Sequence, residues 1–333
     1  MASHLSQCLD SILYQTLKDI EIICIDDGST DHSLDLLYEY QDKFNNLLII
    51  SQSNLGSGPA RNNGIEHCNG QYIGFMDPDD WYPTDDILES LYNAAVTNKA
   101  LICGGSLSRF DGKNIFTSLS KNETDMFFTQ DGFVRYSDYQ FIYGFWRFIY
   151  QRDFIISNNI QFPSYKRGQD PLFFVTAMIF AKEFYALKKV TYCYRSHYDS
   201  IKKISWDAEK TNDYARFIID LLNISDKIGY KKLHTHSIKR YIWYSRLVIS
   251  RRSYLNNSEL PELIEVLNNS INNALWKSEL PSLLEIILSK PSAKFLFKSN
   301  ISTMIKRELT LSKCMMISIL WYCQNLAIKQ LYR

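Results

Sequence analysis

Residues 20–31 constrain the fold more than any other segment of this chain. The segment is strongly apolar up to residue 25, which suits a buried strand, and it then reaches Asp26 and Asp27. A second apolar strand, residues 72–76, runs into the acidic segment 77–80. In an open α/β sheet, ligands bind beyond the carboxyl ends of the strands. Two strands that end in aspartates therefore indicate a nucleotide site assisted by a metal ion.

Predicted helices and strands alternate along the first hundred residues. Apolar spacing predicts helices near 5–13, 34–40, 60–65 and 86–98, and strands at 20–25, 47–51, 72–76 and 101–103. This alternation predicts an α/β fold, Rossmann-like, with a mostly parallel sheet flanked by helices. Residues from about 205 onward have a helical pattern. We predict a first domain of residues 1–204 and an α-helical C-terminal region of residues 205–333.

Composition narrows the class of protein. The chain is 46% hydrophobic, which excludes disorder as its main state, and no run of 18 apolar residues is present. Its seven cysteines contain no CxxC pair, which argues against a zinc site or a disulfide framework. No signal peptide is visible, and we expect a cytoplasmic protein. Residues 1–100 hold 4 Lys/Arg and 16 Asp/Glu, and residues 101–333 hold 33 and 20, so an acidic N-terminal part precedes a basic remainder.

Eight motifs between residues 4 and 200 resemble the family 2 glycosyltransferases with the GT-A fold. They occur in the family's order and with similar spacing, and they lie at 7–13, 15–22, 25–31, 54–56, 60–62, 74–81, 168–170 and 194–200. The resemblance implies transfer of a sugar from a nucleotide-diphosphate donor, a UDP-sugar, to a hydroxyl group. It also implies inversion at the sugar carbon and help from a divalent cation, Mn²⁺ or Mg²⁺, which neutralises the leaving diphosphate.

By this resemblance, five residues serve the nucleotide and the cation. Asp27 contacts the uracil, Asp26 supports that pocket, Asp77 lies near the ribose, and Arg61 lies near the nucleotide. Asp79 binds the cation. Ordinary structural roles remain open as well: the first two aspartates could face a helix dipole, Asp79 could begin a turn, and Arg61 could be a solvated helix residue.

Three further residues resemble the family's catalytic and acceptor side. Asp170 matches the base that deprotonates the acceptor, although Gln169 replaces the usual glutamate before it. His197 resembles a histidine that completes the cation's ligands or faces the diphosphate. Trp146, with Arg147, is expected to border the acceptor. The alternatives are a helix-capping role for Asp170, a structural histidine, and an ordinary core tryptophan.

The chain departs from the family at its start, because Met1 falls where the family's first strand would just have ended. We expect either that the true start lies upstream or that the product is truncated and impaired. The alternative function is therefore a non-catalytic member that binds glycan or partner enzymes in a polysaccharide assembly complex. A sugar-nucleotide pyrophosphorylase is a weaker alternative, because its glycine- and lysine/arginine-rich N-terminal loop is missing.

The C-terminal region is basic and aromatic. Residues 227–252 carry eight Lys/Arg and no acidic residue, with tyrosine, tryptophan and aliphatic residues between them. Such a helix could lie on an anionic membrane surface, or it could pack on the catalytic domain. The expected acceptor is a surface glycan or lipid-linked oligosaccharide, which suits a peripheral position at the inner face of the cell membrane. No nucleic-acid-binding module is recognised.

Overall fold

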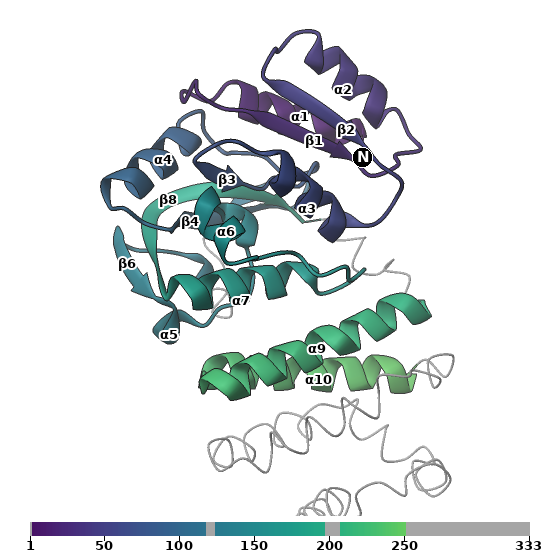
Figure 1. Ribbon diagram of the computed structural model, residues 1–333, viewed down its shortest axis with the longest axis vertical. Coiled ribbons are helices and arrows are strands. Elements are labelled where there is room, and N and C mark those ends of the chain that lie inside the picture. The colour runs from purple at the N-terminus through teal and green to yellow at the C-terminus, as the bar shows by residue number, and fades with distance from the viewer. Residues whose placement is uncertain (1, 118–123, 197–206, 251–333) are drawn as a thin grey trace, which may run out of the picture.

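The computed structural model describes residues 2–117, 124–196 and 207–250 (Figure 1). The first half contains α1 (Ala2–Leu13), β1 (Ile22–Asp26), α2 (Ser33–Gln41), β2 (Leu47–Ser51), α3 (Ser57–His67), β3 (Tyr72–Gly74), α4 (Ile87–Thr97) and β4 (Ile102–Phe110). The second half contains β5 (Ile115–Phe116), β6 (Gly132–Arg135), α5 (Tyr136–Tyr139), β7 (Phe148–Gln151), α6 (Arg152–Ser157), α7 (Gln169–Ala181), β8 (Glu183–Arg195), α9 (Ala208–Ile228) and α10 (Lys231–Ser250). Short 3₁₀ turns occur at Thr124–Met126 and Phe145–Arg147.

The predicted α/β class is confirmed, and the strands form two sheets. β1 and β2 make a parallel pair in register from Ile22↔Leu47 to Asp26↔Ser51. The larger sheet has the order β3-β7-β4-β8-β6, with β5 added beside β4. Within it β4 and β8 are parallel, whereas β3 pairs with β7 in the antiparallel direction. The alternation of helices and strands thus predicted the parallel pair of β1 and β2. All partners of β4, the parallel strand β8 and the antiparallel strands β5 and β7, come from the aromatic segment between residues 105 and 195.

Helix α7 lies at the centre of an aromatic core. Its residues Phe173 and Phe174 are fully buried, and the Phe173 ring stacks on Phe162 with centroids 3.9 Å apart. Phe75, just after β3, meets both rings edge-on. Full burial of a side chain of this size contributes about 1.5–3 kcal/mol. This core fixes the start of α7 against the end of β3, and both of these carry predicted site residues.

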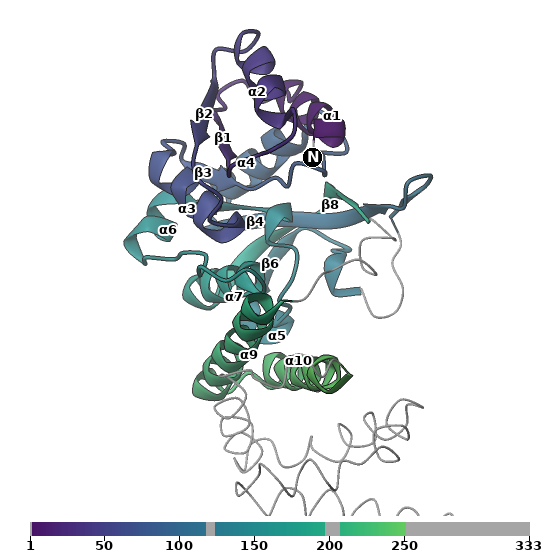
Figure 2. The ribbon, with the colours of Figure 1, turned by 90° about the vertical axis from the view of Figure 1, so that its right-hand side faces the viewer.

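The helices α9 and α10 pack together below α7 (Figures 1 and 2). Leu172 and Val175 of α7 share a buried cluster with Phe217 and Ile218 of α9. Tyr244 of α10 is fully buried in the same cluster. The described part of the basic segment therefore packs on the core along one face. The predicted boundary near residue 204, and the part of the predicted helical region beyond residue 250, lie outside the described residues.

Within the described part of the chain, every helix is too short or too polar to cross a lipid bilayer.

Candidate active site

The carboxyl end of β1 places Asp26 and Asp27 where the sequence predicted. Asp26 is buried, and one of its carboxylate oxygens accepts a hydrogen bond from the Ser29 amide at 3.3 Å. The Asp27 carboxylate accepts bonds from Gln52 Nε2 and from the amides of Leu55 and Gly56, each at 2.8 Å. Asp27 therefore orders the loop after β2. Neither carboxylate caps α2, because the carboxylate that accepts a hydrogen bond from the first amide of α2, that of Ser33, belongs to Asp31.

The acidic loop after β3 is a tight turn. The Asp80 amide donates to the Asp77 carbonyl at 3.0 Å, and Pro78 occupies the position that favours proline in such turns. The alternative interpretation of this segment as a turn is thus correct for its backbone. The turn leaves the side chain of Asp79 half-buried and that of Asp77 facing Arg61.

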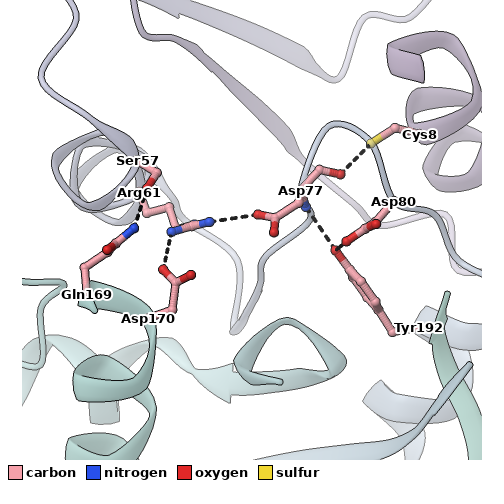
Figure 3. A network of polar contacts seen from close by, with 8 residues as sticks. All are labelled: Cys8, Ser57, Arg61, Asp77, Asp80, Gln169, Asp170 and Tyr192. Carbon is pink, nitrogen blue, oxygen red and sulfur yellow. Dashed lines mark hydrogen bonds and ion pairs between the residues drawn. The ribbon is translucent and has the colours of Figure 1, made fainter. Parts of the chain in front are cut away.

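Strand β8 holds this loop through one buried tyrosine (Figure 3). The Tyr192 hydroxyl donates to Asp80 at 2.8 Å and accepts from the Asp77 amide at 3.1 Å. Asp80 is only 1% exposed, and its other oxygen accepts the Arg195 amide. Burial raises the pKa of Asp80 to about 8. Neither Tyr192 nor Asp80 was predicted as a site residue, because their pairing joins segments that are far apart in sequence.

Arg61 joins the acidic loop to the predicted base. Its guanidinium donates to Asp77 at 2.8 Å and to Asp170 at 2.6 Å (Figure 3). It also lies 4.8 Å from the centroid of the Phe145 ring. Its side chain is 16% exposed, so it is not a solvated helix residue. No local sequence pattern pairs Arg61 with Asp170, since these residues are 109 positions apart.

Asp170 lies in the first turn of α7, next to a backbone that α3 holds in place. Gln169 Nε2 donates to Ser57 Oγ at 2.7 Å, a bond that a glutamate could not donate. The helix cap is Gly168, so the capping role considered for Asp170 is wrong. The surrounding protein displaces water and raises the pKa of Asp170 to about 6, which Arg61 opposes. The side chain remains 37% exposed, which leaves it accessible to an acceptor.

Trp146 lies on the wall of a cavity of about 330 Å³ that also reaches Asp77 and Asp170. Its ring stacks on Tyr194 with planes 7° apart and on Tyr192 with planes 20° apart. The neighbouring Arg147 does not border this cavity. It is fully buried and donates to the Gly105 carbonyl, so its predicted place on the acceptor side is wrong.

The predicted cation ligands are Asp79 and His197. In the ranges that the structure describes, no group of three or more His, Cys, Asp or Glu residues is arranged to hold a metal ion. His197 lies outside those ranges. A cation that binds together with a diphosphate needs only one or two protein carboxylates, because phosphate oxygens supply further ligands. The carboxylate oxygens of Asp79 fit that hard-donor set.

Comparisons with known proteins agree with the fold. Residues 2–155 match the model of glycosyl transferase family 2. The glycosyltransferase EpsH of Bacillus subtilis strain 168 is 31% identical over 204 residues, which span 60% of this chain and 59% of EpsH. The structure of S. aureus TarS 1–349 with UDP-GlcNAc superposes with a TM-score of 0.61 at 19% identity, covering 81% of this chain and 77% of that one.

A more distant structure carries a metal. The mannosyltransferase PcManGT of Pyrobaculum calidifontis, in complex with GDP-Man and Mn²⁺, has a TM-score of 0.50 at 13% identity and covers 89% of this chain and 79% of that one. The fold is that of the GT-A glycosyltransferases. Residues 2–155 of the chain thus contain a match to glycosyl transferase family 2, and the chain spans 59% of the length of EpsH.

Proposed function

We propose that this chain transfers a sugar from a UDP-sugar to a hydroxyl of a surface glycan or lipid-linked oligosaccharide, with inversion at the sugar carbon. The observation that carries the proposal is the cavity that brings Asp77, Asp170 and Trp146 together. One wall comes from the loop after β3 and the other from the start of α7. A donor held at the first and an acceptor held at the second would meet between them.

Asp170 is the proposed base. The acceptor oxygen forms a bond to the anomeric carbon as the bond from that carbon to the diphosphate breaks, and the acceptor proton passes to Asp170. A pKa near 6 suits this role, because the carboxylate is mostly ionised at neutral pH and still attracts a proton. Trp146 offers a flat apolar surface on which a sugar ring could rest.

The donor is proposed to lie along the carboxyl ends of β1 and β3. Asp27 contacts the base with Asp26 behind it, Asp77 lies near the ribose, and Arg61 faces the phosphates. Asp79 would hold Mn²⁺ or Mg²⁺, with His197 as a further proposed ligand. Such a cation, when bound, neutralises the charge that develops on the leaving diphosphate.

Calorimetric titration with UDP, with and without Mn²⁺, tests the donor half of this proposal. We expect binding that depends on Mn²⁺ and is lost in Asp79→Ala. An Asp170→Asn variant should bind UDP as the wild type does, yet transfer at least a hundredfold more slowly, which is the usual contribution of a general base. Equal transfer rates for the two proteins would refute the role of Asp170. UDP binding without transfer to any glycan would favour the non-catalytic alternative.

We also propose that residues 205–333 form a separate C-terminal region that contacts an anionic membrane surface at the cytoplasmic side. Lys231 and Lys239 of α10 are exposed, while Leu233 and Ile238 of the same helix face the core. A helix with these two faces can stay packed on α9 and still present positive charge to lipid headgroups.

A further inference from the structure

Arg147 is a fully buried charge among aromatic side chains. Its side chain is only 1% exposed, and its guanidinium lies 4.9 Å from the centroid of the Phe128 ring and 4.7 Å from that of Phe148. A buried charge is costly unless hydrogen bonds replace the water that it has lost. An apolar side chain of similar volume would pack at this place without that cost. The charge therefore indicates a role besides packing.

The guanidinium donates hydrogen bonds to four uncharged oxygens, which come from three segments of the chain. On β4 it donates to the Gly105 carbonyl. In the segment before β6 it donates to the carbonyls of Asp125 at 3.4 Å and Met126 at 3.3 Å. The fourth acceptor is the Tyr139 hydroxyl of α5, which in turn donates to the Asp125 carbonyl. Because arginine has five N–H donors in a rigid planar group, one side chain can bind all of these oxygens.

These bonds attach residues 125–128 to the core through their backbone. In addition to the two bound carbonyls, the Phe128 amide donates to Ser106 Oγ at 2.9 Å. The Met126 side chain lines the cavity of about 330 Å³ beside Trp146, which we call the acceptor cavity. Arg147 thus fixes one part of the cavity wall from behind, without itself lining the cavity.

Trp146 is a second part of the same wall, and its backbone is fixed through Arg147 as well. The two residues are consecutive in one 3₁₀ turn. The Arg147 carbonyl accepts a hydrogen bond from Thr191 Oγ1 of β8 at 3.0 Å, and its side chain reaches β4 at Gly105. The turn that carries Trp146 is therefore attached to both of these neighbouring strands.

We propose that Arg147 is a positioning residue for the acceptor: it holds Met126 and Trp146 at the separation that an acceptor sugar requires. None of the four oxygens that accept its hydrogen bonds belongs to a residue proposed to contact the donor or the cation. Loss of the guanidinium should therefore loosen the acceptor cavity and leave the donor side unchanged. The acceptor role rests on the proposed transfer reaction, whereas the attachment of residues 125–128 does not.

Hydrogen exchange of the Phe128 amide tests the attachment. Arg147→Met keeps a long unbranched side chain and removes every donor, and we expect this amide to exchange about tenfold faster than in the wild type. Arg147→Lys keeps the charge but not the planar group of donors, so its exchange rate should be intermediate. The matched control is Arg152→Met, because Arg152 also donates to a backbone carbonyl, that of Cys68 at 2.7 Å, but does not reach the acceptor cavity. Its Phe128 amide should exchange as in the wild type.

Steady-state kinetics test the acceptor role. The donors are UDP-glucose, UDP-galactose and UDP-N-acetylglucosamine, the acceptors are methyl glycosides of the same sugars, and the pair that the wild type uses fastest is studied in the variants. In Arg147→Met the KM for the acceptor should rise about tenfold, while the KM for the donor and the calorimetric Kd for UDP stay unchanged. Tyr139→Phe removes one acceptor of the guanidinium and leaves the charge in place. It should raise the acceptor KM in the same direction by a smaller factor, and it decides the question if Arg147→Met does not fold.

Unchanged exchange of the Phe128 amide in a folded Arg147→Met protein would overturn the attachment. An unchanged acceptor KM, or an equal loss of affinity for UDP and for the acceptor, would overturn the positioning role. Absence of any transfer by the wild type would contradict the proposed function instead, and the exchange rates would then decide by themselves whether Arg147 fixes this wall.

Discussion

Arg61 sets the proton affinity of the proposed base. Burial raises the pKa of Asp170 to about 6, and the bond from the Arg61 guanidinium keeps this pKa from rising further. The base must be ionised to accept a proton, so kcat/KM should fall as the pH drops below about 6. In Arg61→Met the lowering contribution is lost, the pKa of Asp170 rises further, and the acid limb of the pH profile should move to higher pH. Steady-state rates from pH 5 to 9 measure this shift.

Arg61→Lys provides the matched control for that experiment. Lysine keeps the positive charge but cannot form the two-pronged contact with Asp77 and Asp170, so its acid limb should stay closer to that of the wild type. A reduced rate with an unmoved acid limb in Arg61→Met would mean that Arg61 acts on the donor alone.

Gly168 shows how one missing side chain positions the base. Its φ is +92°, and a Cβ there would lie 2.3 Å from Cγ of Phe217 on α9. Gly112 has a similar φ of +96° with nothing within 4 Å of the added atom. Both alanine variants should therefore lose about 1 kcal/mol to backbone strain. Gly168→Ala should lose a further 1–3 kcal/mol or so from overpacking. Urea unfolding measures the free energy of unfolding of both variants. Equal losses would show that α9 shifts to accommodate the added methyl group at little cost.

Among single elements, β8 determines the geometry of the acidic loop. Tyr192 satisfies Asp80 and the Asp77 amide with one hydroxyl. Tyr192→Phe leaves both without this partner, and we expect UDP binding in the presence of Mn²⁺ to weaken about tenfold, the effect of losing one such bond. Tyr185→Phe on the same strand is the control and should bind as the wild type does. Titration calorimetry measures the affinity of both variants for UDP. Equal affinities would mean that the turn keeps its conformation without the Tyr192 hydroxyl.

The sequence predicted the elements of the first hundred residues well and those of the next hundred poorly. β2 was placed at its observed bounds, because a short apolar run between polar segments specifies a buried strand. β4 was expected to end at residue 103 but continues to Phe110. Its second half contains serines and glycines, which do not form an apolar pattern, and these residues are in a strand because they pair with β8. β7 was missed because its antiparallel position between β3 and β4 depends on tertiary pairing.

In the candidate site, too, residues that follow a local sequence pattern were predicted and contacts between distant segments were not. Asp26, Asp27 and Asp77 were predicted as site residues because they follow predicted strands, and the structure does place them at or just after the ends of β1 and β3. The contact of Arg61 with Asp170 was missed, because no local pattern encodes a meeting of α3 with α7.

At the scale of the whole molecule, charge is divided between a negative N-terminal part and a positive remainder. The proposed membrane contact uses the exposed lysines of the second part. The protein should co-sediment with vesicles that contain anionic lipid at low salt and be released at about 0.5 M salt, where screening acts within a few ångströms. Vesicles of neutral lipid are the control. If the fraction of protein that co-sediments changes with neither the salt concentration nor the lipid charge, the contact is not electrostatic.

The ion pair between Arg61 and Asp170 has a consequence for how the protein is made. Its partners are 109 residues apart, and the parallel pairing of β4 with β8 joins Cys103 to Tyr185. Contacts of such long sequence separation form late, because a long loop must close before they are gained. A nascent chain that has emerged only as far as β7 therefore has the donor-side loop but neither the base nor the tyrosine that fixes that loop. The ability to bind a nucleotide should arise only when β8 has left the ribosome, near the end of the first two hundred residues.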